Sequence, residues 1–156
     1  MFRVFAAGPI RVKAGFEESV ELAARFGFDG VAIDPGYARS AGPETVVRML
    51  RERGLQAGPW GLPIKLLGPE AEYRAQLEDL PAVAECCGRI GALRASTWVP
   101  CASDESPYAE LFDLLLSRVR EIAAVLDAHG GRLGLEFVGP ATLRAGKKYE
   151  FIHTMD

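Results

Sequence analysis

The chain has 156 residues, 49% hydrophobic and 25% charged, a composition typical of a globular protein and not of a disordered or fibrous one. Its 18 basic and 21 acidic residues give a net charge of −3, so no overall positive field favours nucleic acid or an anionic membrane as a partner. No segment reaches the roughly 18 apolar residues of a transmembrane helix, and the N-terminal apolar stretch is too short for a secretory signal. We therefore expect a soluble, intracellular protein.

The cysteines point to the same compartment. Cys86, Cys87 and Cys101 are odd in number, and no C-x-x-C spacing occurs. This pattern predicts neither a disulfide framework nor a zinc knuckle. We expect these cysteines to be small core residues or to lie on a helix surface, in a reducing cytoplasm.

The first half of the chain alternates short apolar segments with amphipathic ones. Residues 2–6 predict a strand, and the segment after them predicts a helix that a glycine ends. Residues 30–33 predict a second strand, followed by the sequence DPG, which is typical of a turn. Pro43 suits the first position of the next helix and Gly54 its C-terminal cap.

The same alternation continues in the middle of the chain. A third strand begins at Leu55 and runs into the loop AGPWGLP. A helix starts near Pro69 and ends near Gly88 or Gly91. Pro81 falls inside this helix, so we expect a kink or a split there.

Two more strands and one long helix complete the pattern. Residues 93–99 predict the fourth strand, and Ser106 and Pro107 suit the cap and first position of the longest helix. Two glycines end that helix, and residues 133–137 predict a fifth strand.

Strands that alternate with helices predict a parallel sheet with right-handed crossovers. A (β/α) barrel and a doubly wound open sheet both obey this pattern. A dinucleotide-binding sheet is disfavoured, because the first strand leads into Ala7-Gly8-Pro9-Ile10 and not into G-x-G-x-x-G. A five-stranded, flavodoxin-like open sheet remains the alternative to the barrel.

One charged residue stands out in the predicted strands. The segment RLGLEFVGP is an apolar run that ends in Glu136 and a Gly-Pro break. A buried strand has little reason to carry a charge unless the charge meets a metal, a partner or a substrate at its end. Glu136 is therefore the leading candidate for a site residue, and an ion pair with a neighbouring arginine is the other interpretation.

Three segments resemble the sugar phosphate isomerase/epimerase family, whose members adopt the xylose-isomerase-like TIM barrel. They are GFDGVAIDP, LGLEFVGP and the tail GKKYEFIHTMD. The resemblance covers the whole chain, but only as the N-terminal part of the family's domain. A full barrel takes about 250 residues, so we expect residues 1–156 to form a single partial barrel, truncated after the fifth strand.

The resemblance also implies a chemistry. Glu136 matches a glutamate that binds a divalent metal, Mn²⁺, Mg²⁺ or Co²⁺, at the end of the family's fifth strand. The family's other ligands and its catalytic base come from later strands, so no catalytic residue is assigned here and metal binding by this chain is expected to be weak or absent. The implied reaction is isomerisation or epimerisation of a sugar or sugar phosphate by proton transfer next to a carbonyl.

Other side chains follow strands on the face where barrels keep their active sites. Trp60 and Trp98 suit an aromatic wall for a sugar, and the alternative is that each caps the core. Asp34 suits the pocket less well than it suits a turn.

Basic residues follow Glu136 in the sequence. Arg144, Lys147 and Lys148 suit a phosphate or an acidic sugar, with a solvated loop as the alternative, and Arg144 is the one we expect at the substrate. His153 is expected in a loop, and His129 at the C-terminus of the long helix, where a cation complements the dipole.

Two other functions compete with the isomerase. The chain could be a non-catalytic barrel fragment, which would associate with a second copy or with its missing half through open sheet edges. The same barrel serves endonuclease-type repair enzymes, but these use histidines at the ends of the second to fourth strands, where this chain has none. Hydrolase and kinase motifs such as H-E-x-x-H and the P-loop do not occur.

Overall fold

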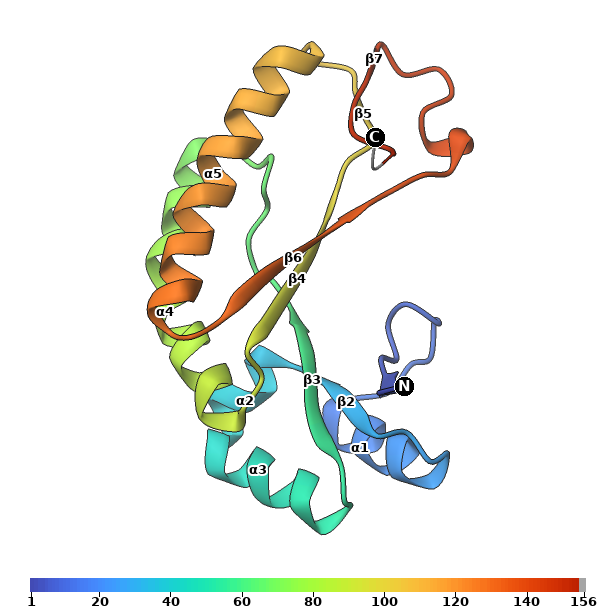
Figure 1. The fold of residues 1–156 in the computed structure, drawn as a ribbon, viewed down its shortest axis with the longest axis vertical. Coiled ribbons are helices and arrows are strands. Elements are labelled where there is room, and N and C mark those ends of the chain that lie inside the picture. The colour runs from blue at the N-terminus through green and yellow to red at the C-terminus, as the bar shows by residue number, and fades with distance from the viewer. Residues whose placement is uncertain (155–156) are drawn as a thin grey trace.

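One parallel sheet organises the protein. The computed structural model describes residues 1–154 (Figure 1), so the last two residues of the tail motif lie outside the described part. Five parallel strands pair in chain order, namely β1 (Val4–Phe5), β2 (Gly30–Ile33), β3 (Gln56–Gly61), β4 (Arg94–Val99) and β6 (Arg132–Phe137). Two short strands, β5 (Ala102–Ser103) and β7 (Tyr149–Glu150), form a separate antiparallel pair.

Helices connect the strands and cover one face of the sheet. They are α1 (Phe16–Arg25), α2 (Pro35–Ala41), α3 (Pro43–Glu52), α4 (Glu70–Ile90) and α5 (Tyr108–Ala128), with a 3-10 turn, η1 (Ala141–Leu143), after β6. Figure 1 shows these α-helices on the outer side of the curved sheet, with the inner side open. No helix within residues 1–154 combines the length and apolar character that crossing a membrane requires.

The strand order decides between the two architectures. A flavodoxin-like sheet has the order 2-1-3-4-5 and carries helices on both faces. Here each strand pairs with the next one along the chain, from β1 to β6. Right-handed crossovers that always step in one direction place all their helices on the same face. The open-sheet alternative is therefore wrong, and the barrel-type arrangement is confirmed.

The core lies between the sheet and the helices. Buried apolar side chains come from alternate strand positions, such as Val31 and Ile33 of β2 and Ala95 and Val99 of β4. The helices contribute the residues that helical spacing predicts, among them Val20, Val46, Leu50, Leu80, Ile122 and Leu126. The apolar face of each helix thus packs against the same side of the sheet.

Close packing of β1 to β3 explains two glycines. A Cβ atom at Gly58 would lie 2.6 Å from Cγ1 of Val4 and 2.7 Å from the carbonyl oxygen of Val31. A Cβ atom at Gly30 would lie 2.6 Å from the carbonyl oxygen of Gln56. The neighbouring strands approach so closely at these positions that no side chain fits.

Several boundaries differ from the sequence prediction. The first strand pairs only over Val4–Phe5, and the helix expected from Pro107 begins one residue later, at Tyr108. The expected split at Pro81 is absent, because α4 runs through it. Proline has no backbone N–H, so the helix loses one hydrogen bond at Pro81. The helix continues through this residue, and Leu80 beside it stays buried in the core.

The DPG segment forms a helix start and not an isolated turn. Asp34 is the N-cap of α2, and its Oδ1 accepts a hydrogen bond from the backbone N–H of Tyr37 at 3.1 Å. Pro35 occupies the first helical position, where a proline is well tolerated. Asp34 therefore has a structural role that the sequence patterns did not separate from a turn.

Candidate functional site

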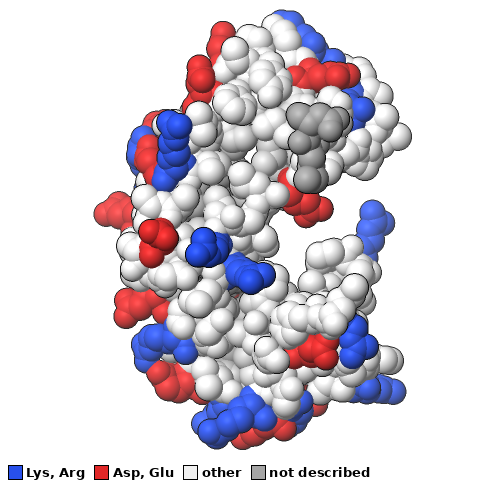
Figure 2. All heavy atoms as spheres, in the orientation of Figure 1, with Lys and Arg blue, Asp and Glu red and all other residues white. Residues whose placement is uncertain are grey.

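The candidate site lies where β4 and β6 end, on the face of the sheet that the helices leave open. Trp98 of β4 is in register with Glu136 of β6, and paired residues of neighbouring strands project from the same face. Val99, the residue after Trp98, is buried on the helix side, so Trp98 and Glu136 point to the opposite side. Figure 2 shows the molecule hollowed on that side, between its N-terminal and C-terminal parts.

Glu136 presents an uncompensated carboxylate. It is exposed, and no described residue forms an ion pair or a side-chain hydrogen bond with it. The ion pair with an arginine, the other interpretation of this residue, is thus not formed within residues 1–154.

One carboxylate does not make a metal site. Within residues 1–154 no three His, Cys, Asp or Glu side chains come together in a way that would hold a metal ion. Hard divalent cations need about six ligands, mostly oxygen. The described residues therefore fit the role of a single ligand and do not fit a complete metal centre.

Trp98 borders two hollows. Its side chain is 62% exposed. One hollow, of about 420 Å³, lies between Trp98 and the loop that joins β3 to α4. The other, of about 390 Å³, lies between Trp98 and the segment after β6, which contributes Val138 and Leu143. Trp98 is therefore accessible from the open face, and its role as an aromatic wall of a ligand site stays a prediction.

Trp60 lies on the other face of the sheet. It is 2% exposed, and its indole N–H donates to the carbonyl oxygen of Ala92 at 2.9 Å. It pairs in register with Ala95, which is buried against the helices. The structure places Trp60 in the core, the alternative role for this side chain, and not on a wall that a sugar can reach.

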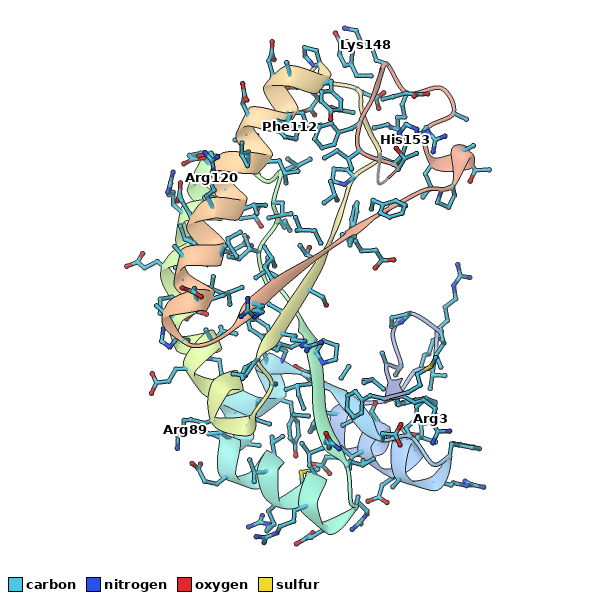
Figure 3. All side chains as sticks on the ribbon, viewed as in Figure 1. Arg3, Arg89, Phe112, Arg120, Lys148 and His153 are labelled. Atoms are coloured by element: carbon cyan, nitrogen blue, oxygen red, sulfur yellow. The ribbon has the colours of Figure 1, made fainter. Side chains whose placement is uncertain are left out.

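The basic residues after Glu136 do not form one cluster with it. Arg144 donates from Nη1 to the carbonyl oxygen of Gly139 at 2.6 Å. Lys147 pairs with Asp104, and this bond holds the pKa of the Asp104 carboxyl below its ordinary value. Lys148 lies over the ring of Tyr149, 4.8 Å from its centroid, and Figure 3 shows it at the outer end of its loop. Arg144 and Lys147 thus stabilise the segment after β6, and a contact between Arg144 and a substrate stays a prediction.

Both histidines lie where the sequence predicts. His153 follows β7 in a loop, with its Nδ1 2.7 Å from the carbonyl oxygen of Phe151. His129 is the C-cap residue of α5. Neither belongs to a metal-binding cluster within residues 1–154.

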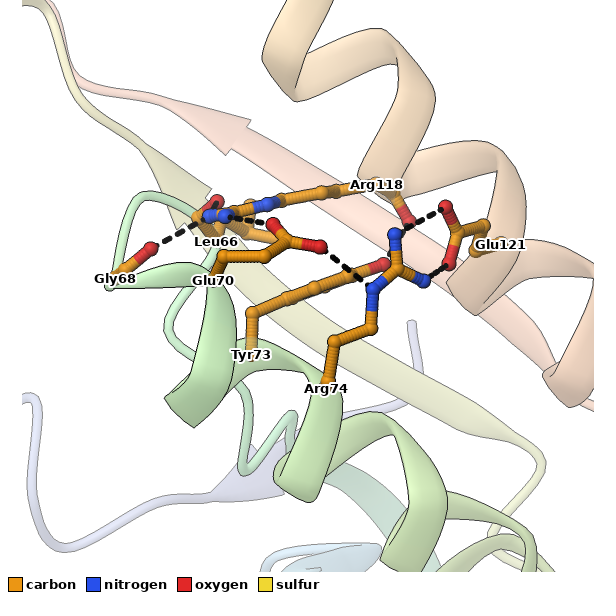
Figure 4. Close-up of polar contacts among 7 residues, drawn as sticks. All are labelled: Leu66, Gly68, Glu70, Tyr73, Arg74, Arg118 and Glu121. Carbon is orange, nitrogen blue, oxygen red and sulfur yellow. Dashed lines mark hydrogen bonds and ion pairs between the residues drawn. The ribbon is translucent and has the colours of Figure 1, made fainter.

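A buried arginine that sequence patterns missed holds the wall of the first hollow. Arg118 of α5 is 4% exposed, and its Nη1 donates to the carbonyl oxygens of Leu66 and Gly68, at 2.8 Å each. Its Nη2 is 2.8 Å from Oε2 of Glu70 (Figure 4). Because Leu66 and Gly68 line the hollow beside Trp98, Arg118 fixes the position of that wall.

Three further side chains, those of Tyr73, Arg74 and Glu121, complete this network in Figure 4. The Arg118 guanidinium lies 4.4 Å from the ring centroid of Tyr73, whose hydroxyl donates to the Arg118 carbonyl oxygen at 3.1 Å. Arg74 bridges Glu70 and Glu121. Hydrogen bonds from Arg118 and then Arg74 hold the pKa of Glu70 below its ordinary value. A sequence signal existed, because Arg118 falls three residues after Leu115 and four before Ile122, within the buried stripe of α5.

The cysteines lead to a first prediction. All three are free and buried, as expected, and burial raises the pKa of the Cys87 thiol to about 12. The thiolate is the reactive form, so we expect Cys87 to resist iodoacetamide at pH 8 in the folded protein and to react in urea. Mass spectrometry of the labelled peptides measures both. Rapid labelling of Cys87 in the folded state would contradict its placement in the core.

The comparisons with known proteins agree with this fold. The profile of the xylose isomerase-like TIM barrel family matches residues 20–155. A xylose isomerase domain protein from Alicyclobacillus acidocaldarius is 30% identical, with a TM-score of 0.82 over 94% of this chain and 54% of that chain. No curated protein matches the sequence.

Two more distant structures share the fold. The IOLI protein, solved with a bound zinc atom, is 15% identical, with a TM-score of 0.75 over 89% of this chain and 52% of that chain. The 3-keto-D-glucoside 4-epimerase YcjR from E. coli is 17% identical, with a TM-score of 0.66 over 79% of this chain and 51% of that chain. The chain thus spans about half the length of these structures. With its matched profile and its strand order, the chain belongs to the xylose isomerase-like TIM barrel family.

Proposed function

We propose that this chain forms part of the active site of an isomerase or epimerase that acts on a sugar or sugar phosphate by proton transfer next to a carbonyl. The observation that carries the proposal is Glu136, a free carboxylate at the end of β6 that is level with Trp98 on the open face. Solved structures with the same fold include YcjR and D-psicose 3-epimerases, which supports this reaction class.

In this proposal each side chain has a limited role. Glu136 supplies one ligand to a divalent metal, and the bound metal would polarise the carbonyl and the neighbouring hydroxyl of the substrate. Trp98 borders the substrate, and Arg144 holds the loop after β6 through Gly139. The remaining ligands and the proton-transferring base would come from residues outside 1–154, and a partial site of this kind is incomplete by itself.

Metal binding tests the role of Glu136. We expect this chain to bind Mn²⁺ far more weakly than a full-length barrel of the family, because most of the ligands are missing. Electron paramagnetic resonance of free Mn²⁺ measures the affinity. Glu136→Gln should weaken binding further, whereas Glu150→Gln, which alters another exposed carboxylate, should not. Equal effects of the two variants would refute Glu136 as a ligand, and tight retention that Glu136→Gln abolishes would show a complete site.

Proton exchange tests whether the chain catalyses alone. We expect no appreciable exchange of solvent deuterium into ketoses or their phosphates, because proton abstraction needs a positioned base that the described residues do not offer. NMR of the recovered sugars measures the exchange. Exchange above the buffer rate that disappears in Glu136→Gln would show that this chain already contains a working site.

A further inference from the structure

The free edge of β6 carries a sequence that is complementary to itself. Within residues 1–154, β6 pairs with β4 on one side and with no strand on the other. Residues 132–136 read RLGLE, with Arg132 at one end, Glu136 at the other and Gly134 at the centre. We propose that two copies of this chain pair antiparallel along this edge, around a two-fold axis at Gly134. Arg132 of each copy then lies opposite Glu136 of the other.

The backbone of β6 presents the groups that this pairing requires. The Arg132 N–H donates to the carbonyl oxygen of Leu93 at 2.8 Å, so Arg132 and the alternate residues after it turn their backbone groups toward β4. Leu133 and Leu135 therefore turn theirs to the free edge. When Leu133 of one copy lies opposite Leu135 of the other, the two residues exchange both N–H···O bonds, and the two-fold axis repeats the pair. Sheets that combine parallel and antiparallel strands are common.

The charges distinguish this register from its neighbours. Symmetric registers centred on Leu133 or Leu135 also join the free backbone groups, but they place Arg132 opposite an uncharged residue. Arg132 and Glu136 lie on the open face, and neither forms an ion pair within the described part of the chain. Arg132 is also in register with Arg94 of β4, another exposed arginine. A carboxylate from the second copy would offset the repulsion between these two neighbouring cations.

The other face of this edge carries mostly apolar surface that the same pairing would cover. Leu133 and Leu135 line a groove beside β6, together with residues of α5 that include Val119 and Ala123. The Leu135 side chain is 47% exposed. A two-fold axis perpendicular to the sheet keeps the helices of both copies on one side, so the two grooves face each other across the axis. Association would thus remove leucine side chains from water as well as join the strands.

Charge reversal tests the register. Arg132→Glu alone sets two carboxylates opposite each other at both ends of the paired segment, and Glu136→Arg alone sets two guanidinium groups there. We expect each variant to associate on the order of tenfold more weakly than the unsubstituted chain. An equimolar mixture of the two variants should recover the association, because each then meets opposite charges on the other. Sedimentation velocity over a concentration series measures these affinities.

The two substitutions in one chain separate this proposal from the metal-binding role of Glu136. A chain with both Arg132→Glu and Glu136→Arg keeps the complementary charges in reversed order, so it should associate like the unsubstituted chain. The same chain lacks the carboxylate at position 136 and should lose the contribution of that group to Mn²⁺ binding. Association and metal binding are thus judged independently.

A cysteine at the axis tests the geometry. The two Gly134 residues would form a pair without hydrogen bonds, with Cα atoms about 4.5 Å apart, a distance that a disulfide spans. A Cβ atom at Gly134 would lie 3.6 Å from the carbonyl oxygen of Ala95, so a side chain fits there. Gly134→Cys should give a disulfide-linked dimer under mild oxidation. Ser96→Cys, in register with Gly134 on β4, is the matched control and should not, because both copies of β6 lie between the two Ser96 positions.

Four results would overturn the proposal. They are an unsubstituted chain that stays monomeric, charge reversals that do not weaken association, a mixture of the two variants that does not recover it, and cross-linking of Ser96→Cys as readily as of Gly134→Cys. Association that survives both single reversals would place the contact at another surface, such as the edge of β1.

Discussion

Replacing Arg118 with alanine should lower the free energy of unfolding by about 3 kcal/mol, the range found when one partner of a buried polar network is removed. The variant loses the hydrogen bonds to the carbonyl oxygens of Leu66 and Gly68. These two oxygens then lack the donor that the guanidinium supplied. It also opens space over the Tyr73 ring. Urea unfolding followed by circular dichroism measures the loss.

A neighbouring arginine on the same helix provides the control. Arg120 is exposed, forms no ion pair with the described residues and is labelled on the surface of α5 in Figure 3. Arg120→Ala should change the free energy of unfolding by less than about 0.5 kcal/mol. Arg118→Lys should recover only part of the loss, because an ammonium cannot reproduce the guanidinium fork. Similar small losses for both alanine variants would contradict a structural role for Arg118.

The alternation of elements was readable from the sequence, but the order of the strands was not. The limits of β2 agree with the prediction, since the strand begins at Gly30 and Asp34-Pro35 follow it. The barrel and the open sheet share the same alternation, and only strand pairing over long sequence separations distinguishes them. Those pairings depend on which face each helix covers, a property of the whole molecule.

Only part of the candidate site could be predicted from the sequence, for a related reason. Glu136 stood out as a charge in an apolar run, and Trp98 lies within β4, along which buried and more exposed residues alternate. Trp60 lies in the segment AGPWGLP, which has no alternation to indicate its face, and a shift of one residue along a strand turns a side chain from one face to the other. The sequence therefore left both roles open for each tryptophan, and the structure separates them, with Trp98 exposed and Trp60 in the core.

The unpaired edges of the sheet lead to the last prediction. β6 and β1 are the outer strands of the sheet within residues 1–154, and each leaves one row of backbone groups without a strand partner. Beside β6 lies a groove of about 510 Å³ whose lining is mostly apolar, with residues of α5, Leu133 and Leu135, and also includes Asp127 and Arg132. In a closed barrel every strand has two neighbours. An open parallel edge next to an apolar groove favours pairing with another chain.

We therefore expect this chain to associate in solution, as a dimer, a larger oligomer or an aggregate, and light scattering over a range of concentrations measures this. Leu135→Lys places a charge at the β6 edge and should shift association to at least several-fold higher protein concentration, since charges at an edge oppose strand addition. Phe26→Lys, at an exposed apolar residue beyond the end of α1, is the matched control and should have no such effect. A monomer at high concentration that melts cooperatively would show that these five strands and their helices are stable without a partner.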